Sequence, residues 1–314
     1  MKALVTGAAG FIGSRIASTL AADGHEVVGL DDLSEGTLDN LDDAPSVAFV
    51  EADLRDAAAV ERAAEGCDVI FHEGAKRSVP RSLVEPVLTT EVNVLGTLNV
   101  LLAGRSAGAR VVWASSSSVY GDQDSFPLHE EMVPRPKSPY AASKLAGAAY
   151  ARAYWTSLGV PTISLRYFNV YGPRQDPASE YAAVVPRFIT ACLTGGRPTI
   201  YGDGEQARDF TFIDDVVRAN LRAAAAPEAA FGSAFNVGGG ATPTSINELL
   251  STIAGFTGAQ PDPIREPARE GDVHYTAADM NRTTELLGHR PQVDMHEGLR
   301  RTVEWFRMQV VTPA

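Results

Sequence analysis

A tyrosine and a lysine four residues apart form the part of this sequence with the clearest capacity for chemistry. They are Tyr140 and Lys144, in the segment SPYAASK. Ser138 is a favourable N-cap and Pro139 suits the first helical position, so a helix is predicted from here to about Leu158. The two side chains then lie one turn apart on one face, where the ammonium group can approach the phenol oxygen. We therefore expect Tyr140 to have a lowered pKa and to act as a base near neutral pH.

This spacing alone also fits an ordinary surface tyrosine and a solvated lysine, so the segments around it decide the interpretation. The preceding segment, 111–121, reads as a buried strand followed by four serines, a valine, a tyrosine and a glycine. Ligands bind at the carboxyl ends of the strands of a parallel sheet. A serine at this strand end could hydrogen-bond a substrate hydroxyl group beside Tyr140.

A glycine motif near the N-terminus predicts a phosphate-binding loop. Residues 2–6 read as a buried strand, and Gly7, Gly10 and Gly13 follow it at a spacing close to that of dinucleotide-binding loops. The next residues have the apolar periodicity of a helix. Glycines let the backbone approach a pyrophosphate at the helix N-terminus, so this segment predicts a dinucleotide site.

An acidic pair after the second predicted strand indicates which dinucleotide binds. The apolar segment 26–30 ends at Asp31 and Asp32. An acid at this place hydrogen-bonds the adenosine ribose and repels a 2′-phosphate, which favours NAD over NADP. The alternative is an ordinary solvated loop. A third strand, 47–50, leads to Asp53, which could meet the adenine amino group.

The predicted strands and helices alternate, which indicates an α/β fold with a doubly wound parallel sheet. Residues 1–170 are expected to form the dinucleotide-binding domain, with later returns to its sheet. Proline and glycine become frequent after residue 170, so 171–314 are expected to be mainly a smaller, loop-rich substrate-binding part. The remaining predicted strands are 68–71, 111–114 and 161–165, and the predicted helices are 57–64, 84–107, 140–158 and 295–308.

Composition excludes several classes of partner. The chain has 314 residues and a formal net charge of −12, without a basic run, so nucleic acid and anionic membranes are poor partners. Cys67 and Cys192 form neither a disulfide framework nor a zinc-ligand spacing, and no metal site is expected. No apolar run is long enough for a signal peptide or a transmembrane helix, so a cytoplasmic protein is expected.

Taken together, these motifs resemble the extended short-chain dehydrogenase/reductase family, and most closely its UDP-sugar 4-epimerases. The resemblance extends over essentially the whole chain. It implies a Rossmann-type fold with tightly bound NAD, and a catalytic group of Ser116, Tyr140 and Lys144. In the implied reaction Tyr140 takes the proton of the sugar 4-hydroxyl group while the C4 hydride passes to NAD. A transient 4-keto sugar turns over and receives the hydride on its other face.

The resemblance also implies the residues that contact each ligand. The cofactor-binding residues are expected to be Gly7, Gly10, Phe11, Ile12, Gly13, Asp31, Asp32, Asp53, Leu54, Lys76, Asn93, Tyr140, Lys144 and Tyr167. The substrate-binding residues are expected to be Ser117, Asn169, Val185, Tyr201, Arg208, Arg269 and Thr276. Isolated arginines are usually in surface ion pairs. In this setting Arg208 and Arg269 are expected to clamp the diphosphate, because guanidinium groups are permanently charged planar donors.

Several positions distinguish substrates within the family. Ser117 and Ser118 stand where the sister dehydratases carry their acid and base, which disfavours dehydration. Asn169 disfavours a uronate, whereas the serine run is common among uronate epimerases. Thr276 falls on the gatekeeper position and is small, which leaves room for an N-acetyl group. Glu73 departs from the pattern, in which alanine is usual.

Four alternatives remain open from the sequence. The first is a UDP-glucuronate 4-epimerase, and the second is another NAD-dependent dehydratase or decarboxylase of nucleotide sugars. The third is an NAD-binding regulator without chemistry, and the fourth is an oxidoreductase that releases its reduced cofactor. The family usually dimerises through a four-helix bundle, so a homodimer through helices 84–107 and 139–158 is expected.

Overall fold

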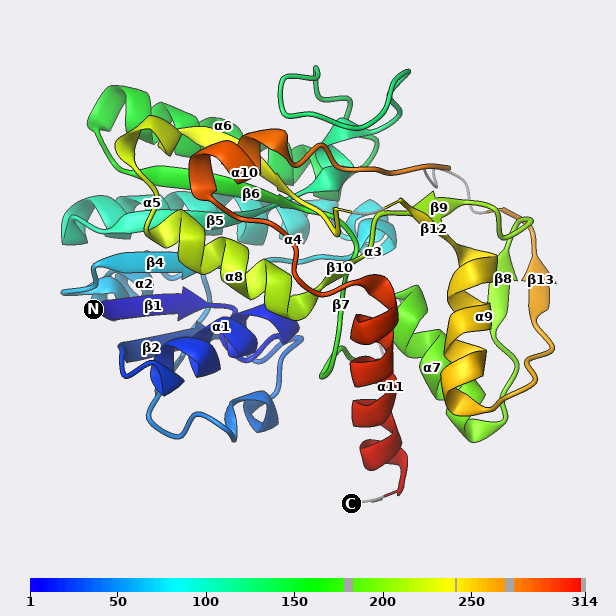
Figure 1. The fold of residues 1–314 in the computed structure, drawn as a ribbon. Helices are drawn as coiled ribbons and strands as arrows, with labels where there is room; N and C mark the ends of the chain where they lie inside the picture. Colours follow the sequence, from blue (N-terminus) through cyan, green and yellow to red (C-terminus); the bar gives the residue numbers. More distant parts are fainter. Residues whose placement is uncertain (178–182, 241, 269–273, 312–314) are drawn as a thin grey trace.

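A seven-stranded parallel sheet forms the centre of the computed structural model (Figure 1), which describes residues 1–177, 183–240, 242–268 and 274–311. The strand order is β11-β6-β5-β4-β1-β2-β3. The chain builds the sheet outward from β1 in one direction and from β4 in the other, so the order reverses between them, where such sheets bind ligands. The strands are β1 (Lys2–Thr6), β2 (Glu26–Asp31), β3 (Ala48–Glu51), β4 (Val69–His72), β5 (Arg110–Ser116), β6 (Thr162–Tyr167) and β11 (Ser233–Val237).

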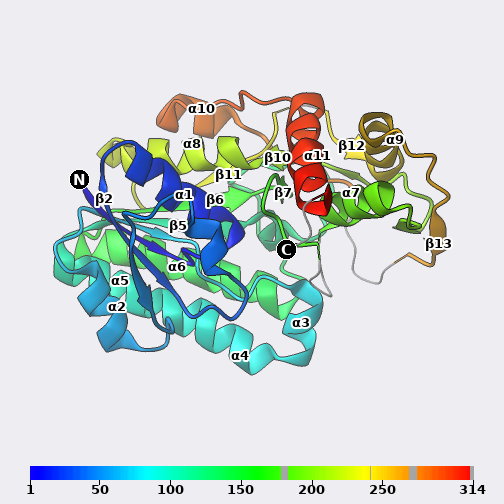
Figure 2. The ribbon, with the colours of Figure 1, turned by 90° about the horizontal axis from the view of Figure 1, so that it is seen from below.

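Helices cover both faces of this sheet, which confirms the predicted Rossmann-type architecture (Figures 1 and 2). One face carries α2 (Ala57–Ala64), α5 (Gly96–Ala107) and α6 (Pro139–Leu158). The other carries α1 (Phe11–Ala22) and α8 (Ile213–Ala224), and α10 (Asn281–Leu287) packs beside β11. Apolar side chains of the strands alternate between the two layers, so Val5 joins the α1 side and Leu4 the α2 side.

A smaller layer built mostly from the second half of the chain lies beside the carboxyl end of the sheet (Figure 1). Its core is apolar and includes Phe188, Leu249 and Leu299. Its helices are α7 (Val184–Thr194), α9 (Ile246–Thr257) and α11 (Met295–Val311). Short strands pair within it: β7 (Val170–Tyr171) with β10 (Thr211–Phe212), β8 (Thr199–Tyr201) with β13 (Ile264–Glu266), and β9 (Ala207–Arg208) with β12 (Thr244–Ser245).

The helix predicted over 84–107 begins at Pro86, two residues later than predicted, and continues to Ala107 through a π-helical turn. The chain forms α3 (Val79–Val84), α4 (Pro86–Thr90), a π-helical turn (Glu91–Leu95) and then α5. Glu85 leaves the helical conformation, with φ −120° and ψ 58°, because the residue before a proline is disfavoured in the α region. Most other predicted boundaries differ from the structure by one to three residues at an end.

Within the described residues, one helical stretch, Pro86–Ala107, has a length and composition that would allow it to cross a membrane. More than half of it, 56%, is buried inside the protein. It packs on α2 and α6 as a helix of the sheet's outer layer. Length and composition therefore carry little weight here, because a buried helix of a folded domain meets the same criteria.

Candidate active site

At two positions of the loop between β1 and α1, Gly7 and Gly13, only glycine fits. Gly7 has φ +68°, and a Cβ atom there would lie 2.7 Å from the backbone nitrogen of Gly74. A Cβ atom on Gly13 would lie 2.1 Å from the carbonyl oxygen of Gly7. The loop and the strand end after β4 therefore pack backbone against backbone. This close packing leaves the N-terminus of α1 open toward the cavity, as phosphate binding requires.

A single cavity at the carboxyl end of the sheet collects nearly all of the predicted cofactor-binding residues. The residues that line it include Gly7, Gly10, Phe11, Ile12, Gly13, Asp31, Asp32, Asp53, Leu54, Lys76, Tyr140, Lys144 and Tyr167. Their places at the ends of β1, β2, β4 and β6 and in the first turns of α1 and α6 explain why segments far apart in sequence meet here. We refer to this space as the cofactor cavity.

Asn93 is the one predicted cofactor residue that does not line the cofactor cavity. Its amide instead holds the backbone of Lys76, with Oδ1 accepting from the Lys76 N–H at 2.7 Å and Nδ2 donating to the Lys76 carbonyl oxygen at 2.9 Å. It also donates to the Ser143 hydroxyl group of α6 at 3.0 Å. Asn93 therefore fixes the loop after β4 relative to α6 and positions Lys76 indirectly.

The two predicted acids after β2 have different surroundings. Asp31 is buried, and its carboxylate accepts hydrogen bonds from the Ala9 N–H (3.0 Å) and the Leu33 N–H (2.8 Å). Burial raises the pKa of Asp31, and these two N–H groups oppose that rise. Asp32 is exposed and accepts from the Ser34 backbone and hydroxyl groups. Asp31 thus links the strand end to the glycine loop.

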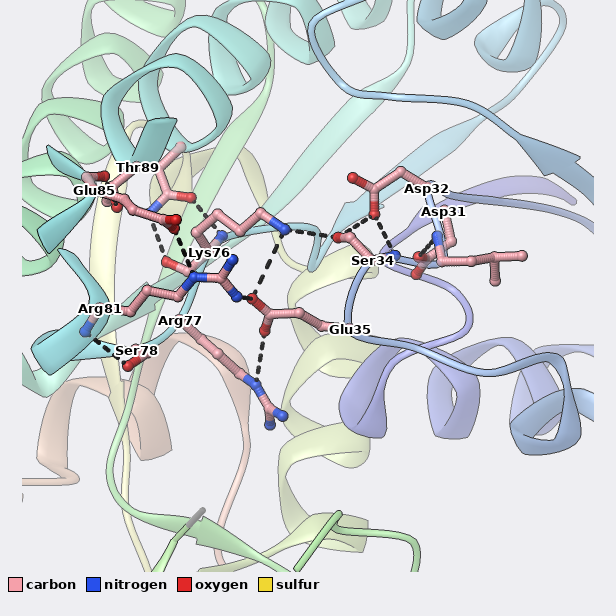
Figure 3. Close-up of polar contacts among 12 residues, drawn as sticks. Asp31, Asp32, Ser34, Glu35, Lys76, Arg77, Ser78, Arg81, Glu85 and Thr89 are labelled. Atoms are coloured by element: carbon pink, nitrogen blue, oxygen red, sulfur yellow. Dashed lines mark hydrogen bonds and ion pairs between the residues drawn. The ribbon is translucent and has the colours of Figure 1, made fainter. Parts of the chain in front are cut away.

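A network of ion pairs spans the cofactor cavity between the loops after β2 and β4 (Figure 3). Glu35 lies within 3.8 Å of Lys76 Nζ, 3.3 Å of Arg77 Nε and 3.7 Å of an Arg81 nitrogen. Lys76 Nζ also donates to the Ser34 hydroxyl group at 2.7 Å. Glu35 and Arg77 were not predicted to line the cofactor cavity. The signal that could have identified them is their position, because each follows shortly after the end of a predicted strand.

Asp53 lines the cavity but already has a partner within the protein. Its carboxylate accepts from Arg55 Nε at 3.0 Å and from the Arg55 backbone N–H at 2.8 Å. The Arg55 guanidinium group lowers the pKa of Asp53. This carboxylate is therefore ionised and oriented at the end of β3, where it was predicted to meet the adenine.

Two of the predicted catalytic residues, Tyr140 and Lys144, line the cofactor cavity, and the third, Ser116, follows its lining residue Ser115. Ser138 caps α6 by accepting from the Ala141 N–H at 3.1 Å, and this places Tyr140 in the first helical turn. Ser116 ends β5, and its hydroxyl group accepts from the Ser118 N–H at 3.1 Å and contributes to lowering the pKa of Tyr140. Lys144 is 4% exposed, and its ammonium group donates to the Ala114 carbonyl oxygen at 2.7 Å. The three side chains come from β5 and α6, which pack directly on each other.

The predicted lowering of the Tyr140 pKa by Lys144 is wrong for this structure. Burial raises the pKa of Tyr140, and Glu73 adds to the rise, whereas the Ser116 hydrogen bond and the Arg77 charge lower it. Lys144 is directed to the strand carbonyl group of Ala114, and burial lowers its own pKa to about 8. The reason is desolvation, which penalises both charged forms in a dry cavity.

A second cavity contains most of the predicted substrate-binding residues. It is lined by Asn169, Val185, Tyr201 and Arg208, together with Arg187, Gln206 and Phe210. Asn169 has φ +32°, a conformation that asparagine tolerates better than most residues, and its amide donates to the Asp209 carbonyl oxygen at 2.9 Å. We refer to this space as the substrate cavity. Tyr167 lines the cofactor cavity and Asn169 lines the substrate cavity, so residues two positions apart in the chain contribute to both spaces.

Thr276 lies directly beside Asn169, although 107 positions separate them. Its hydroxyl oxygen is 3.4 Å from Asn169 Nδ2 and accepts from the Asp209 N–H at 3.3 Å. The neighbouring Tyr275 packs edge-on against Phe126, with ring centroids 4.9 Å apart. Of the remaining predicted substrate residues, Ser117 begins a 3-10 turn and is not among the residues that line either cavity, and Arg269 lies outside the described residues.

In the part of the chain that the structure describes, no group of three or more histidine, cysteine, aspartate or glutamate side chains could hold a metal ion. Cys67 and Cys192 are both buried and unbridged.

Comparison with known proteins agrees with this geometry. The family described as "NAD dependent epimerase/dehydratase family" matches residues 3–238. A UDP-glucose 4-epimerase of Mycolicibacterium smegmatis is 46% identical over 313 residues, which cover 98% of this chain and 99% of that protein. The chain therefore belongs to the NAD dependent epimerase/dehydratase family, and it is an enzyme that uses NAD. The family resemblance and the cofactor inferred from the motifs are thereby confirmed.

Two solved structures show how far the similarity extends in space. UDP-glucose 4-epimerase of Thermotoga maritima, solved with UDP-glucose, matches with a TM-score of 0.94 at 36% identity and covers 99% of this chain and 100% of that one. UDP-N-acetylglucosamine 4-epimerase of Methanobrevibacter ruminantium, in complex with UDP-N-acetylmuramic acid, matches with a TM-score of 0.93 at 37% identity, covering 98% of each chain. Their bound ligands differ in the sugar, so overall similarity leaves the sugar undetermined.

Proposed function

We propose that this chain is an isomerase that interconverts the C4 epimers of a UDP-hexose through a transient 4-keto sugar. One observation carries the proposal: Tyr140 and Lys144 line the cofactor cavity next to the end of β5, which carries Ser116. We place the junction with the substrate cavity at the segment 167–169, which links Tyr167 of the first cavity to Asn169 of the second. A sugar 4-hydroxyl group placed at this junction would lie between a base and a hydride acceptor. The relatives named as UDP-glucose 4-epimerases support the same assignment.

Each residue at the junction has a defined part in this proposal. Tyr140 takes the proton of the 4-hydroxyl group, and Ser116, which contributes to lowering the pKa of Tyr140, bridges the two oxygens. Lys144 holds the ribose next to the nicotinamide. NAD, when bound, supplies the hydride acceptor and a positive charge that helps to ionise Tyr140. Arg208 holds the diphosphate, so the keto sugar can turn over without leaving.

The Asp31 carboxylate supports the choice of NAD over NADP. It is buried at the end of β2 and already fixed by two backbone N–H groups, so it cannot swing away from an approaching ligand. A 2′-phosphate brought to this position would meet a second negative charge in a partly desolvated place, which is unfavourable by several kcal/mol at most.

The sugar specificity is proposed from Thr276. This residue is small and lies beside Asn169, which leaves space for an N-acetyl group, while Tyr275 packs on Phe126. We propose that UDP-GlcNAc and UDP-GalNAc are substrates together with UDP-glucose and UDP-galactose.

Replacing Thr276 with tyrosine tests this specificity. In Thr276→Tyr the phenol fills the space beside Asn169, so turnover of UDP-GlcNAc falls by roughly 10- to 100-fold, the range expected when a pocket excludes one group. Turnover of UDP-glucose stays within a few fold. The matched control is Thr276→Ser, which keeps the hydroxyl group that accepts from Asp209 and should process both sugars. Equal losses of turnover for UDP-GlcNAc and UDP-glucose in Thr276→Tyr would show that Thr276 does not determine the sugar specificity.

A uronate is the second candidate substrate, and the serine run favours it. Ser115 lines the cofactor cavity, and the hydroxyl groups of Ser115 and Ser118 are buried without a hydrogen-bond partner among the described residues. Such groups could receive a substrate carboxylate. Dehydration is disfavoured, because Ser117 and Ser118 cannot supply the acid and base that eliminate water.

Proton NMR of the purified protein with UDP-glucose, UDP-GlcNAc and UDP-glucuronate in separate tubes, without added NAD, tests the proposal. New anomeric signals of UDP-galactose and UDP-GalNAc are the expected result. Conversion of UDP-glucuronate alone would show that the substrate is the uronate and not a UDP-hexose. No change in any tube, even after NAD is supplied, would refute the proposed activity.

We further propose that the enzyme is a homodimer that pairs the helices α4, α5 and α6 of each subunit. This face carries exposed apolar side chains, among them Val87 (68% exposed) and Leu95 (47% exposed), and a shallow apolar groove formed with Tyr150. A contiguous apolar patch on a folded domain marks an interaction surface. Figure 2 shows these helices along one side of the molecule.

A charge on the proposed dimer face should separate the subunits. In Val87→Glu each interface would bury two unpaired carboxylates, so light scattering after gel filtration should give the monomer mass. The control is Val133→Glu, because Val133 is 74% exposed but lies in the loop before α6, away from the groove. A monomeric wild type, or a dimeric Val87→Glu variant, would contradict the proposed interface.

A further inference from the structure

Glu73 places a carboxyl group in the cofactor cavity that the mechanism above does not use. It directly follows β4 and lines the cavity together with Tyr140, Lys144 and Tyr167. The Tyr167 hydroxyl group donates to its Oε1 at 2.7 Å. The same hydroxyl group accepts from Asn220 Nδ2 of α8 at 2.8 Å, and the Glu73 N–H donates to the Thr6 carbonyl oxygen at 3.2 Å. The carboxyl group is therefore fixed by contacts from β6 and, through Tyr167, from α8.

The groups that face Glu73 can be named element by element. From β6 the Tyr167 phenol contacts it, and Tyr140 and Lys144 of α6 line the same cavity. Its neighbour His72 is bonded to Thr6 and Thr97 and stays neutral, because burial lowers its pKa to about 3. Among the described residues, no cation lies within 4 Å of Glu73 to form an ion pair.

We propose that Glu73 is a positioning residue that sets the pH range over which Tyr140 and Lys144 act together. The inference rests on the proposed function, because it assigns to Glu73 an effect on the base and the ammonium group of that reaction. Glu73 itself touches neither the reacting sugar nor the proton that is transferred. It acts through the charge that it presents to the two residues of α6.

The sign of the effect follows from charge. Burial raises the pKa of Glu73 to about 7, so its carboxyl group changes from neutral to negative near neutral pH. The negative form disfavours a second negative charge and therefore raises the pKa of Tyr140. It favours a neighbouring positive charge and therefore raises the pKa of Lys144, which burial alone depresses. Above neutral pH, Glu73 thus keeps Lys144 protonated to higher pH and delays the ionisation of Tyr140.

Replacing Glu73 with glutamine removes the charge and retains an acceptor for the Tyr167 hydroxyl group. Two measurements on the purified holoenzyme test the inference. The first is the ultraviolet titration of tyrosinate, in which the Tyr140 contribution is the part missing from Tyr140→Phe. The second is the pH profile of kcat. In Glu73→Gln the Tyr140 signal and the alkaline limb of the profile should both move to lower pH, while the variant and wild type converge on the acid side of pH 7.

The control is Glu130→Gln. Glu130 is also a partly buried carboxyl group whose pKa is raised by burial, but it accepts from the Asn236 N–H at 2.7 Å and does not line the cofactor cavity. It should leave the Tyr140 signal and the alkaline limb in place. Should Glu73→Gln fail to fold, Glu73→Ala removes the same charge and is expected to shift both readings in the same direction.

Unshifted titrations in a folded Glu73 variant with normal NAD content would overturn the inference. A uniform fall in kcat without displacement along the pH axis would overturn it equally, since that result indicates a purely structural part. The tyrosinate titration needs no substrate. Failure of the proposed function, seen as a wild type inactive on every UDP-sugar, is therefore distinguishable from failure of this inference.

Discussion

Replacing Tyr140 with phenylalanine is expected to lower turnover by ~10²- to 10⁴-fold, the usual contribution of a positioned general base. The Tyr140 phenol lies in the first turn of α6 and lines the cofactor cavity, and the variant loses only its oxygen. Binding of the UDP-sugar, measured by calorimetry, should be retained, because the proposed anchor for the diphosphate, Arg208, lies in the other cavity.

Tyr154→Phe is the matched control for this experiment. Tyr154 lies on the same helix, α6, and packs beside the apolar cluster below the sheet, outside both cavities. It should keep normal turnover. Near-normal turnover in Tyr140→Phe would instead remove Tyr140 as the base and leave the junction of the cavities without an assigned proton acceptor.

Replacing Gly13 with alanine is expected to remove most of the bound NAD. The new Cβ atom would lie 2.1 Å from the Gly7 carbonyl oxygen, and Gly7 is itself confined by the backbone of Gly74, so the glycine loop must move. Overpacking of this kind typically costs 1–3 kcal/mol, which corresponds to roughly 10- to 100-fold in affinity if the loss falls on the bound state. The NAD content of the purified protein, read from its absorbance after denaturation, measures the effect.

A glycine elsewhere in a helix provides the control. Gly255 lies in α9, and a Cβ atom there meets no atom within 4 Å. Gly255→Ala should retain full NAD content and raise helix stability by about 1 kcal/mol. Full NAD content in Gly13→Ala would show that the loop does not define the phosphate-binding site.

The parts of the fold that the sequence predicted are those with strong local signals. The Ser138 cap and the proline after it placed α6 correctly, and the glycine spacing located the turn between β1 and α1. The start of the predicted helix 84–107 was placed too early, because the local restriction that Pro86 imposes on Glu85 was not applied, and the π-helical turn Glu91–Leu95 has no signal in the sequence pattern. The return of β11 to the far edge of the sheet also required tertiary information.

The sequence predicted which residues belong to the site better than it predicted their contacts and pKa values. The four-residue spacing predicted that Tyr140 and Lys144 share one face of a helix. It did not show that the Lys144 ammonium group donates to the Ala114 carbonyl oxygen. Desolvation depends on every atom around a group, so the raised pKa of Glu73 has no signal in sequence. The contact between Thr276 and Asn169 likewise comes from chain folding, and only the family resemblance pointed to it.

The central claim is that one hydride leaves C4 and returns to C4 within the same active site. UDP-glucose labelled with deuterium at C4 tests it directly, with NMR and mass spectrometry of the product formed in ordinary water. The account predicts UDP-galactose that retains the deuterium at C4, without added NAD and without accumulation of NADH. Product that has lost the label to solvent, or NADH that accumulates in proportion to substrate consumed, would contradict it.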